Sequence, residues 1–530
     1  MASDKDAQVI ISGGGPVGMA LAIELGQRGI SVLVLEKYPE PQRIPKGQNL
    51  TPRTMEHFRA WGAETQLRAA RPVPAEFGIG GLTAYGTLLG DYHYDWLKRE
   101  LVRPYYAADN ERLPQYETEA VLRARAVELD AVTLRTGVEV DAAKQDETGV
   151  TVTAHERASG AGFSVRANYA VGCDGARSPL RVSAGLTQTV RDHDRQMVLL
   201  VFQSEALHKA LLDRHPGKSF FNVLHPDLEG YWLFFGRVDL EGEFFFHAPM
   251  PAGADKESFN FQSYVESAVG AEIDMDVRHR GFWDCRVAIA DDYGNDRIFV
   301  AGDAAHNHPP YGGYGINTGF EDARNLGWKL AARLQGWGGS TLLGSYDAER
   351  RPVFASTATD FIEASIATDR AFLKKHDPVR DRASFEDEWA GRATGAASEV
   401  GSYQPNYRGS PIVAGARDGS ADAIAEHRFE ARAGYHLAPR TVPSGGTTFD
   451  HLGSGFTLLA LGADGHAGTF AEAARALSIP LDVVPLTREG ALEDYGASLV
   501  LVRPDHFVSW SGDDSSEAAE ILRLATGKAA

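Results

Sequence analysis

Three glycines at fixed spacing near the start of the sequence form a pattern that can bind a dinucleotide. Gly13, Gly15 and Gly18, with Pro16 and Val17 between the last two, fit the pattern G-x-G-x-x-G. The first glycine permits a tight turn from a strand into a helix, the second lets the backbone approach a diphosphate, and the third lets helix and strand pack closely. The diphosphate would then lie against free N–H groups at the helix N-terminus.

The segments around these glycines have the pattern of a β-α-β unit. Residues 8–12 and 31–36 are short apolar runs typical of buried strands, and residues 19–28 have apolar positions at helical spacing. About 30 residues is the size expected for two parallel strands joined by a helix. Glu36 ends the second strand, where a carboxylate can accept hydrogen bonds from a ribose. An incidental glycine turn is the alternative, but the flanking segments favour one tightly held dinucleotide.

The composition predicts a folded chain of several domains. At 530 residues the chain should form three or four units, and 43% hydrophobic with 24% charged residues is ordinary for globular proteins. A formal net charge of -19 disfavours binding to nucleic acid or to anionic membranes. The charged N-terminus lacks an apolar signal segment, and no apolar run approaches the ~20 residues that span a bilayer. We therefore expect a soluble, cytoplasmic protein.

Cysteine usage points away from disulfide and metal chemistry. The only two cysteines are Cys173 and Cys285, which are too few for a disulfide framework or an all-cysteine metal site. We expect both to be buried, reduced thiols.

Changes in the pattern of residue types along the chain predict an α/β fold with a discontinuous nucleotide-binding domain. Aromatic runs at residues 231–235 and 244–246 indicate an antiparallel sheet inserted into a Rossmann-like domain, and a long helix is expected over residues 319–334. The expected boundaries are residues 1–184 and 286–400 for the nucleotide-binding domain with a helical extension, 185–285 for the inserted sheet that binds substrate, 401–447 for a connector, and 448–530 for a small α/β domain.

Two further motifs lie downstream of the first glycines. Residues 172–178 read Gly-Cys-Asp-Gly-Ala-Arg-Ser, and residues 297–306 read Arg-Ile-Phe-Val-Ala-Gly-Asp-Ala-Ala-His, followed by a run rich in Pro and Gly over 309–319. With these three motifs in order, the chain resembles the group A flavoprotein aromatic hydroxylases, the family of para-hydroxybenzoate hydroxylase and phenol hydroxylase. Residues 47–58 look most like the branch of 2,4-dichlorophenol 6-monooxygenase.

The resemblance implies that the dinucleotide is FAD and that NADH or NADPH is a transient co-substrate without a domain of its own. It implies that Asp303 contacts the ribityl region, that Asp174 supports both flavin and coenzyme, and that Pro309 and Pro310 lie over the reactive face of the flavin. Backbone N–H groups before the long helix would face the flavin pyrimidine edge. Either aspartate could instead only cap a turn. The other residues implied in FAD binding are Lys37, Arg43, Gln48, Gln115, Val140, Gly313, Gly315, Ile316 and Asn317.

Two other functions are compatible with parts of this pattern. Asp303, His306 and His308 could bind a metal ion, since a His-x-His pair beside a carboxylate is a common ligand set, and the protein would then be a metal-dependent hydrolase. A protein that keeps the flavin fold but only binds is the second alternative. The flavin motif already explains residues 303–308, so we expect no metal there and structural roles for both histidines.

The resemblance also implies the reaction and the place of the substrate. The coenzyme would reduce FAD, O2 would form a flavin C4a-hydroperoxide, and a phenol-like or hydroxypyridine ring would be hydroxylated, in natural-product biosynthesis or aromatic catabolism. Phe221, Phe235, Arg237 and Phe245 would face this ring, and Arg237 would act in catalysis with Pro309 and Pro310. Phenylalanines where para-hydroxybenzoate hydroxylase has polar groups predict an uncharged ring and leave the phenol-activating base unidentified. Core packing is the alternative for each aromatic.

The C-terminal unit resembles the thioredoxin-like tail of phenol hydroxylases, including the segment 501–505. Because this unit contains no cysteine, it cannot perform disulfide chemistry, and we expect an interface or stabilising role. We also expect a homo-oligomer. The identity of the aromatic substrate, the position hydroxylated and the choice between NADH and NADPH are open at this point.

Overall fold

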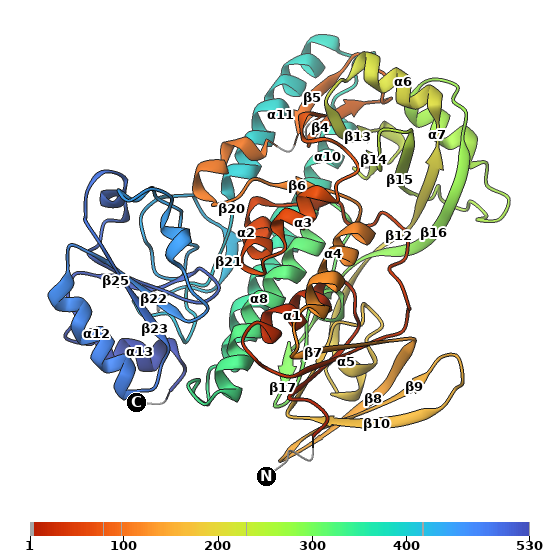
Figure 1. Ribbon diagram of the computed structural model, residues 1–530. Coiled ribbons are helices and arrows are strands. Elements are labelled where there is room, and N and C mark those ends of the chain that lie inside the picture. The colour runs from red at the N-terminus through yellow and green to blue at the C-terminus, as the bar shows by residue number, and fades with distance from the viewer. Residues whose placement is uncertain (1–4, 78, 97, 229, 416–417, 529–530) are drawn as a thin grey trace.

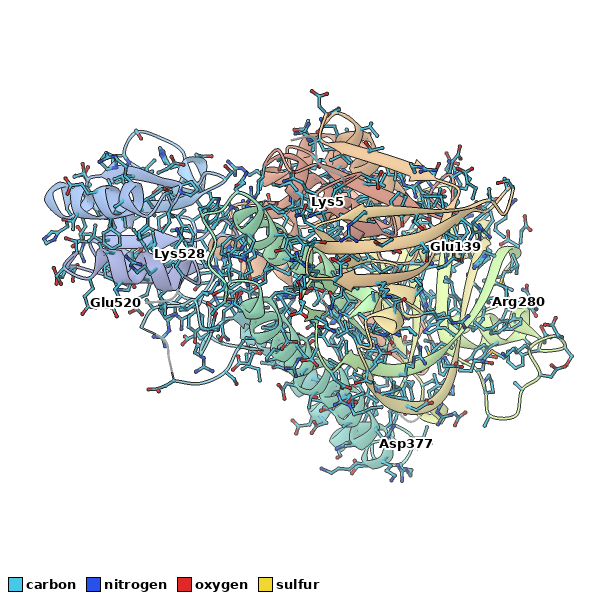
Figure 2. The ribbon with its side chains drawn as sticks, turned by 90° about the horizontal axis from the view of Figure 1, so that it is seen from below. Lys5, Glu139, Arg280, Asp377, Glu520 and Lys528 are labelled. Atoms are coloured by element: carbon cyan, nitrogen blue, oxygen red, sulfur yellow. The ribbon has the colours of Figure 1, made fainter. Side chains whose placement is uncertain are left out.

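The computed structural model describes the whole chain except residues 1–4, 78, 97, 229, 416–417 and 529–530. Figure 1 shows a central nucleotide-binding domain, a large sheet beneath helices α6 (Glu205–Arg214) and α7 (Phe261–Val269), and a C-terminal domain on the opposite side. In the view from below (Figure 2), the C-terminal domain with Glu520 and Lys528 lies at one end of the molecule, and Arg280 of the large sheet lies at the other.

A six-stranded sheet forms the centre of the nucleotide-binding domain. Its neighbours are all parallel except β17 and β18, and β1 lies between β11 and β2. Ligands of such sheets bind beyond the carboxyl ends of the central strands, which is where the chain leaves β1. In spatial order the strands are β17 (Gly294–Asn295), β18 (Ile298–Val300), β11 (Tyr169–Gly172), β1 (Val9–Ser12), β2 (Val32–Glu36) and β7 (Val132–Thr136).

Both faces of this sheet are covered, which explains why its strands are apolar throughout. One face packs against helices α1 (Pro16–Gly26), α4 (Gln115–Val127) and α8 (Tyr314–Leu334). The other face packs against a three-stranded antiparallel sheet, and Val140 is buried between the two sheets. Its strands are β8 (Val138–Asp146), β9 (Gly149–Glu156) and β10 (Gly162–Ala167).

The predicted antiparallel sheet is present, but its strands come from more of the chain than residues 185–285. It has eight strands, and two of them come from residues 80–96, so the boundary that assigned all of residues 1–184 to the nucleotide-binding domain is wrong. In spatial order they are β19 (His306–Asn307), β16 (Asp276–Ala290), β12 (Gln188–Gln203), β15 (Glu243–Pro249), β14 (Trp232–Arg237), β13 (Lys218–Leu224), β4 (Gly80–Tyr85) and β5 (His93–Trp96).

Helices follow the nucleotide-binding domain, as the sequence predicts. They are α9 (Gly344–Ser356), a π-helical segment (Thr357–Glu363), α10 (Ala364–Lys375) and α11 (Arg382–Ser402). Of these, α10 and α11 lie beside β4 and β5 in Figure 1. The connector that follows contains only the short strands β20 (Tyr403–Asn406) and β21 (Asp422–Ile424) in its described part.

The C-terminal domain has the predicted thioredoxin-like arrangement of a mixed sheet flanked by helices. β22 and β23 are parallel, and β22, β24 and β25 are antiparallel neighbours. Trp328 of α8 packs into the core of this domain. The elements are β22 (Phe456–Leu461), α12 (Asp464–Ala476), β23 (Leu481–Leu486), β24 (Leu499–Val502), β25 (Val508–Gly512) and α13 (Ala518–Ala525).

Within the described part of the chain, no helix has the length and apolar character needed to cross a membrane.

Candidate active site

The turn after β1 packs the first glycine motif against the second. A Cβ on Gly13, which has φ +100°, would lie 2.4 Å from the carbonyl oxygen of Cys173. A Cβ on Gly18 would lie 1.9 Å from the carbonyl oxygen of Gly13. Gly15, the N-cap residue of α1, differs from these two glycines, because a Cβ on it would meet no other atom within 4 Å. The chain therefore leaves open space in front of free helix N–H groups, as a diphosphate requires.

Glu36 lies beside this turn, where the sequence predicts it. Its carboxylate accepts hydrogen bonds from the N–H groups of Gly14 (2.6 Å) and Tyr38 (2.7 Å), so that it braces the glycine turn. Each carboxylate oxygen keeps a second lone pair, and a ribose hydroxyl could still donate to it. The adjacent Lys37 is exposed.

Val17 joins the third motif to the first. A Cβ on Gly302 would lie 2.9 Å from the Val17 side chain, and a Cβ on Gly319 would lie 2.6 Å from it. Asp303, from the third motif, is exposed, although desolvation by the surrounding protein atoms raises the pKa of its carboxyl. Asp174, from the second motif, accepts a hydrogen bond from Ser12 Oγ (2.8 Å) at the end of β1. All three motifs therefore meet beyond the carboxyl end of β1.

These observations fit FAD and give a first prediction. Gly15→Ala should leave the fold intact but lower the affinity for FAD by roughly tenfold or more, because the new methyl group occupies the space for the diphosphate. Equilibrium titration of the FAD-depleted protein with FAD, followed by flavin fluorescence, measures this affinity. Gly344→Ala is the matched control, since its Cβ also meets nothing within 4 Å and lies at the start of α9. Equal FAD affinity in the two variants would place the diphosphate elsewhere.

The first turn of α8 presents its N–H groups at the predicted flavin position. Gly312 and Gly313 have φ +65° and +70°, and they turn the chain into a helix that begins at Tyr314, five residues earlier than predicted. A Cβ on Gly47 would lie 3.3 Å from Ile316, and Gly315 lies beside His308. The first turn of a helix has N–H groups without intrahelical partners, and these can bind an electron-rich ring edge.

The side chain of Asn317 makes hydrogen bonds within the protein, whereas the predicted contact with the flavin is through the backbone of this segment. Its Oδ1 accepts from the N–H of Thr51 (2.9 Å) and from Thr54 Oγ1 (2.6 Å), and its Nδ2 donates to the carbonyl oxygens of Asn49 (2.8 Å) and Gly313 (2.6 Å). The protein itself therefore uses this amide, which locks α8 to the segment before α2 (Pro52–Ala60). Any contact of Asn317 with FAD would be through its backbone.

The predicted residues from the segments near 43–48 and 115 lie together. Gln115 Oε1 accepts from the N–H of Gly47 (3.2 Å), and Gln48 Oε1 accepts from Arg112 (2.7 Å), while Gln48 Nε2 is buried without a partner. Arg43 is exposed near the Tyr116 ring. The unpartnered Gln48 amide next to the first turn of α8 fits the predicted contact with FAD.

The proline loop is tied to the eight-stranded sheet. Pro309 is buried and Pro310 is half-buried. Tyr311 Oη accepts a hydrogen bond from the N–H of Trp232 (3.0 Å) and donates to the carbonyl oxygen of Gly230 (3.3 Å), and the Tyr311 and Trp232 rings lie 4.1 Å apart. The distance between the proline loop and the sheet is therefore set by direct contacts.

Three of the four residues predicted to face the substrate lie on the outer face of the sheet, opposite to Phe245. Phe221 and Phe235 are buried on the outer face, against α6 and α7. Arg237 also lies on that side, where it bonds His208 of α6 (2.8 Å) and stacks on Phe244. Successive side chains of a strand point to opposite faces, so these residues cannot share a face with Phe245. This placement does not support the substrate contacts of the three residues or the catalytic role of Arg237, which stay predictions from the resemblance.

The inner face, toward the nucleotide-binding domain, carries a different set of side chains. Phe245 lies on this face, where it belongs to one hydrophobic cluster with Phe220 and with Ile44 of the nucleotide-binding domain. The register places Asn222, Phe234 and His247 in one row across β13, β14 and β15. Phe234 is half-buried, whereas Asn222 and His247 are buried. The sequence prediction missed this row. Because side chains alternate along a strand, Phe245 on the inner face implies His247 on the same face, but Asn222 and Phe234 join the row only through the strand register.

Two polar groups of this row lack partners. Both side-chain amide atoms of Asn222 and the Nδ1 atom of His247 are buried without hydrogen bonds. Burial lowers the pKa of His247 to about 3, so that its imidazole is neutral at pH 7. The imidazole is held edge-on to Phe245 and Trp283, at 5.4 and 5.0 Å between ring centroids. Buried polar atoms without partners are uncommon in proteins, and a water molecule, an ion or a ligand can supply the missing partner.

The histidines of the third motif do not form a metal site. His306 Nε2 bonds Asp322 Oδ2 (2.6 Å), and Asp322 also accepts from Arg350 (2.8 Å). Burial lowers the pKa of His308 to about 4, and its ring lies 5.6 Å from that of Phe354. Among the described residues, no group of three His, Cys, Asp or Glu side chains could hold a metal ion. The geometry gives no support to the hydrolase alternative.

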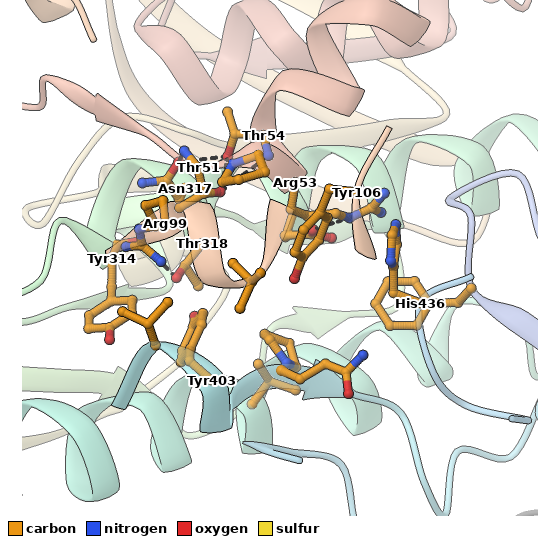
Figure 3. Close-up of a pocket in the computed structure, with 18 of the residues that line it drawn as sticks. Thr51, Arg53, Thr54, Arg99, Tyr106, Tyr314, Asn317, Thr318, Tyr403 and His436 are labelled. Atoms are coloured by element: carbon orange, nitrogen blue, oxygen red, sulfur yellow. Dashed lines mark hydrogen bonds and ion pairs between the residues drawn. The ribbon is translucent and has the colours of Figure 1, made fainter. Parts of the chain in front are cut away.

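A second cavity lies on the far side of the first turn of α8 (Figure 3). Arg53 and Tyr106 line it together with Tyr314 and Tyr403, and its volume is about 50 Å³. Sites for drug-sized ligands have volumes of about 300 Å³ or more, so this cavity has room for only a few water molecules. It is therefore not the place of an aromatic substrate.

Comparisons with known proteins agree with this geometry. The family model described as FAD binding domain matches residues 6–361, and the model described as aromatic-ring hydroxylase, C-terminal, matches residues 431–529. A 4-methyl-5-nitrocatechol 5-monooxygenase of a Burkholderia species is 33% identical over 98% of this chain and 96% of that protein. The tetracenomycin A2 monooxygenase-dioxygenase of Streptomyces glaucescens is 28% identical over 99% of this chain and 96% of its own.

A solved structure gives the same result at the level of the fold. The rebeccamycin biosynthetic enzyme RebC with reduced flavin superposes with a TM-score of 0.85 at 28% identity, over 99% of both chains. The converging glycine motifs, the proline loop and the two family matches have one explanation. The chain belongs to the group A flavoprotein aromatic hydroxylases, with FAD as its cofactor.

Proposed function

We propose that the protein hydroxylates a phenol-like or hydroxypyridine ring, using NADH or NADPH and O2, while the ring lies between the inner face of the eight-stranded sheet and the proline loop. FAD, when bound and reduced, supplies the activated oxygen. The observation that carries the proposal is the row of Asn222, Phe234 and His247, because it combines an accessible aromatic surface with unpartnered polar atoms opposite the loop that Tyr311 holds in place.

The chain's own residues have separate tasks in this reaction. The N–H groups in the first turn of α8 favour negative charge at the ring edge that faces them. The aromatic side chains of the inner face exclude water from the reacting atoms. His247 is neutral, and so its unpartnered Nδ1 can accept the hydrogen of a phenol hydroxyl and orient it. Glu36, Asp174 and Asp303 remain the residues proposed to hold the polar parts of FAD.

The names of the relatives support a hydroxylated aromatic substrate but not one compound. The Burkholderia relative is named for a nitrocatechol and the Streptomyces relative for a tetracenomycin. The expectation of an uncharged ring rested on phenylalanines at two positions that are polar in para-hydroxybenzoate hydroxylase, and it loses support because Phe221 and Phe235 lie on the outer face of the sheet. Membership of the dichlorophenol monooxygenase branch, a homo-oligomeric state and a cytoplasmic location are parts of the proposal that rest on the sequence.

A panel of phenols and hydroxypyridines tests the proposal. For an accepted ring, we expect faster NADH or NADPH oxidation and a product heavier by one oxygen atom, measured by absorbance and mass spectrometry. Coenzyme oxidation that no ring accelerates would instead support the flavin-fold binding protein. Peroxide without an oxygenated product identifies a ring that binds but is not hydroxylated.

Replacement of the third-motif aspartate tests the FAD site directly. Asp303→Ala should strip most FAD from the purified protein, because Asp303 follows Gly302 where the three motifs meet and its exposed side chain contributes little to the core. Asp303→Asn, which keeps a hydrogen-bond acceptor, should retain more FAD. The ratio of flavin to protein absorbance measures occupancy. Full occupancy in the alanine variant would show that the ribityl contact is misplaced.

A further inference from the structure

Arg112 is a buried cation without a carboxylate partner at the boundary between the FAD site and the large sheet. It lies in β6 (Glu111–Arg112), which pairs with β3 (Asn49–Leu50), and only 2% of the residue is exposed. Its Nη2 donates to Gln48, while Nε and Nη1 have no acceptor. Within the described chain, no carboxylate oxygen lies within 4.0 Å of its guanidinium, since the adjacent Glu111 carboxylate pairs with Arg68 and Arg71.

The position of Arg112 relates it to the substrate and not to the diphosphate. Its guanidinium lies 5.0 Å from the centre of the Phe220 ring, on the inner face of the sheet. On the other side it contacts Gln48, whose neighbour Gly47 packs on Ile316 in the first turn of α8. The glycine turn that accommodates the diphosphate lies instead at the start of α1.

An unpaired charge in this position is unfavourable for the protein alone. Burial and the repulsion of Arg237 lower the pKa of Arg112 to about 9, so the side chain is still charged at pH 7. Two other deeply buried arginines have carboxylate partners, since Arg350 pairs with Asp322 and Arg503 with Glu349, whereas Arg237 on the outer face of the sheet has none in the described chain. A buried cation with unpartnered N–H groups beside the inner face of the sheet fits an anionic ligand, which would supply the missing partner.

We propose that Arg112 binds an anionic oxygen of the aromatic substrate, a carboxylate or a phenolate, while the substrate ring packs on the inner face beside Phe220. This inference rests on the proposed function and specifies its substrate class. Asn222 lies two residues beyond Phe220 in β13, on the same face and about 6.6 Å further along the strand, so that its unpartnered amide can donate to a second polar group of the ring.

Matched pairs of ligands and variants test this proposal on the FAD-loaded, full-length protein. The first comparison is between hydroxybenzoates and their carboxamides. The second is between 4-nitrophenol and phenol, at pH values above and below the pKa of 4-nitrophenol. The change in flavin absorbance on titration measures the affinity for each ligand. We expect the wild type to bind the anionic member of at least one pair about tenfold more tightly or better. Arg112→Met should abolish this preference, and Arg112→Lys should restore part of it. The pair that shows the preference identifies the anion as carboxylate or phenolate.

Arg237→Met is the control, because Arg237 is also a buried arginine without a carboxylate partner but lies on the outer face of the same sheet. It should keep the preference. The proposal is overturned if the wild type shows no preference for the anionic member of any pair, which includes the case in which no ring changes the flavin absorbance. It is also overturned if Arg112→Met keeps the preference of the wild type. A shift of the flavin midpoint potential in Arg112→Met with the ligand preference intact would assign Arg112 to the flavin instead. Neutral phenols that are hydroxylated would leave the proposed function standing in each case.

Discussion

Glu349→Gln is expected to lower the free energy of unfolding by about 3–5 kcal/mol, because it leaves the buried Lys329 ammonium without an anion and removes one of the two anions of the buried Arg503. Glu349, on α9, is fully buried. Its carboxylate accepts from Arg503 (2.6 Å), Lys329 (2.6 Å), Ser410 (2.6 Å) and Asn325 (2.7 Å). Glutamine keeps the shape but not the charge, so the Lys329 ammonium loses its counter-ion and the Arg503 guanidinium keeps only Asp505.

The same substitution should change how stability depends on pH. Burial alone would raise the pKa of Glu349, but the positive charges of Arg503 and Lys329 outweigh burial and hold the pKa well below its usual range. A folded-state pKa below the unfolded value, about 4.3, means that the ionised carboxylate stabilises the fold fully above that pH and loses this effect as the pH falls below it. The glutamine variant should therefore lose less stability than the wild type on acidification below about pH 4.

Denaturant titration followed by tryptophan fluorescence measures both effects, since Trp328 donates to Asp505 within the same cluster (3.1 Å). Glu386→Gln is the matched control, because Glu386 pairs with Arg382 at the surface of α11 and such pairs contribute little. A midpoint for Glu349→Gln that equals that of the control would show that the cluster does not stabilise the fold.

This cluster explains what a thioredoxin-like domain without cysteines does in a hydroxylase. Arg503 and Asp505 belong to the C-terminal domain, whereas Lys329 lies on α8, the helix whose first turn borders the flavin site. Arg324 of α8 also donates to the carbonyl oxygen of Pro504. The C-terminal domain therefore buries the distal half of α8 and holds the helix in place, which is the stabilising role expected from the sequence.

The nucleotide-binding half was predictable from sequence because its information is local. The turn at Gly13 and Gly18 requires glycine whatever the rest of the chain does, and a strand, turn and helix follow one another within about 30 residues. The contacts of Val17 with Gly302 and Gly319 could not be derived from spacing. Only the family resemblance brought those distant segments together, and the structure supplies the packing that explains it.

The substrate-binding half was harder to predict from the sequence, because its strands have too few polar side chains to mark one face. The run Phe244-Phe245-Phe246 has no alternation between apolar and polar side chains, so it does not show which face is inward. Pairing of β4 with β13 joins residues more than 130 positions apart, and no local signal announces it. Arg112 gave no signal either, because a charged residue in a two-residue strand looks like a surface residue until its neighbours are known.

Neighbouring phenylalanines on opposite faces of β14 provide the sharpest test of the inner-face assignment. Phe235→Ala should cost about 3–5 kcal/mol of stability, because Phe235 is fully buried and its ring lies 4.6 Å from that of Phe246 in the outer core. Phe234→Ala should cost much less stability, because Phe234 is half-buried, but should lower kcat/KM for an accepted phenol by about tenfold, the worth of one aromatic stacking contact.

Thermal unfolding and steady-state hydroxylation separate the two effects, with kcat/KM measured well below the melting temperature of each variant. Both substitutions remove the same ring from adjacent positions of one strand, so any general weakening of β14 would affect both in the same way. Opposite outcomes can therefore arise only from the direction in which each side chain points. If Phe235→Ala, rather than Phe234→Ala, lowered kcat/KM at unchanged stability, the substrate would lie on the α6 and α7 side of the sheet, and the unpartnered Asn222 and His247 would need another ligand.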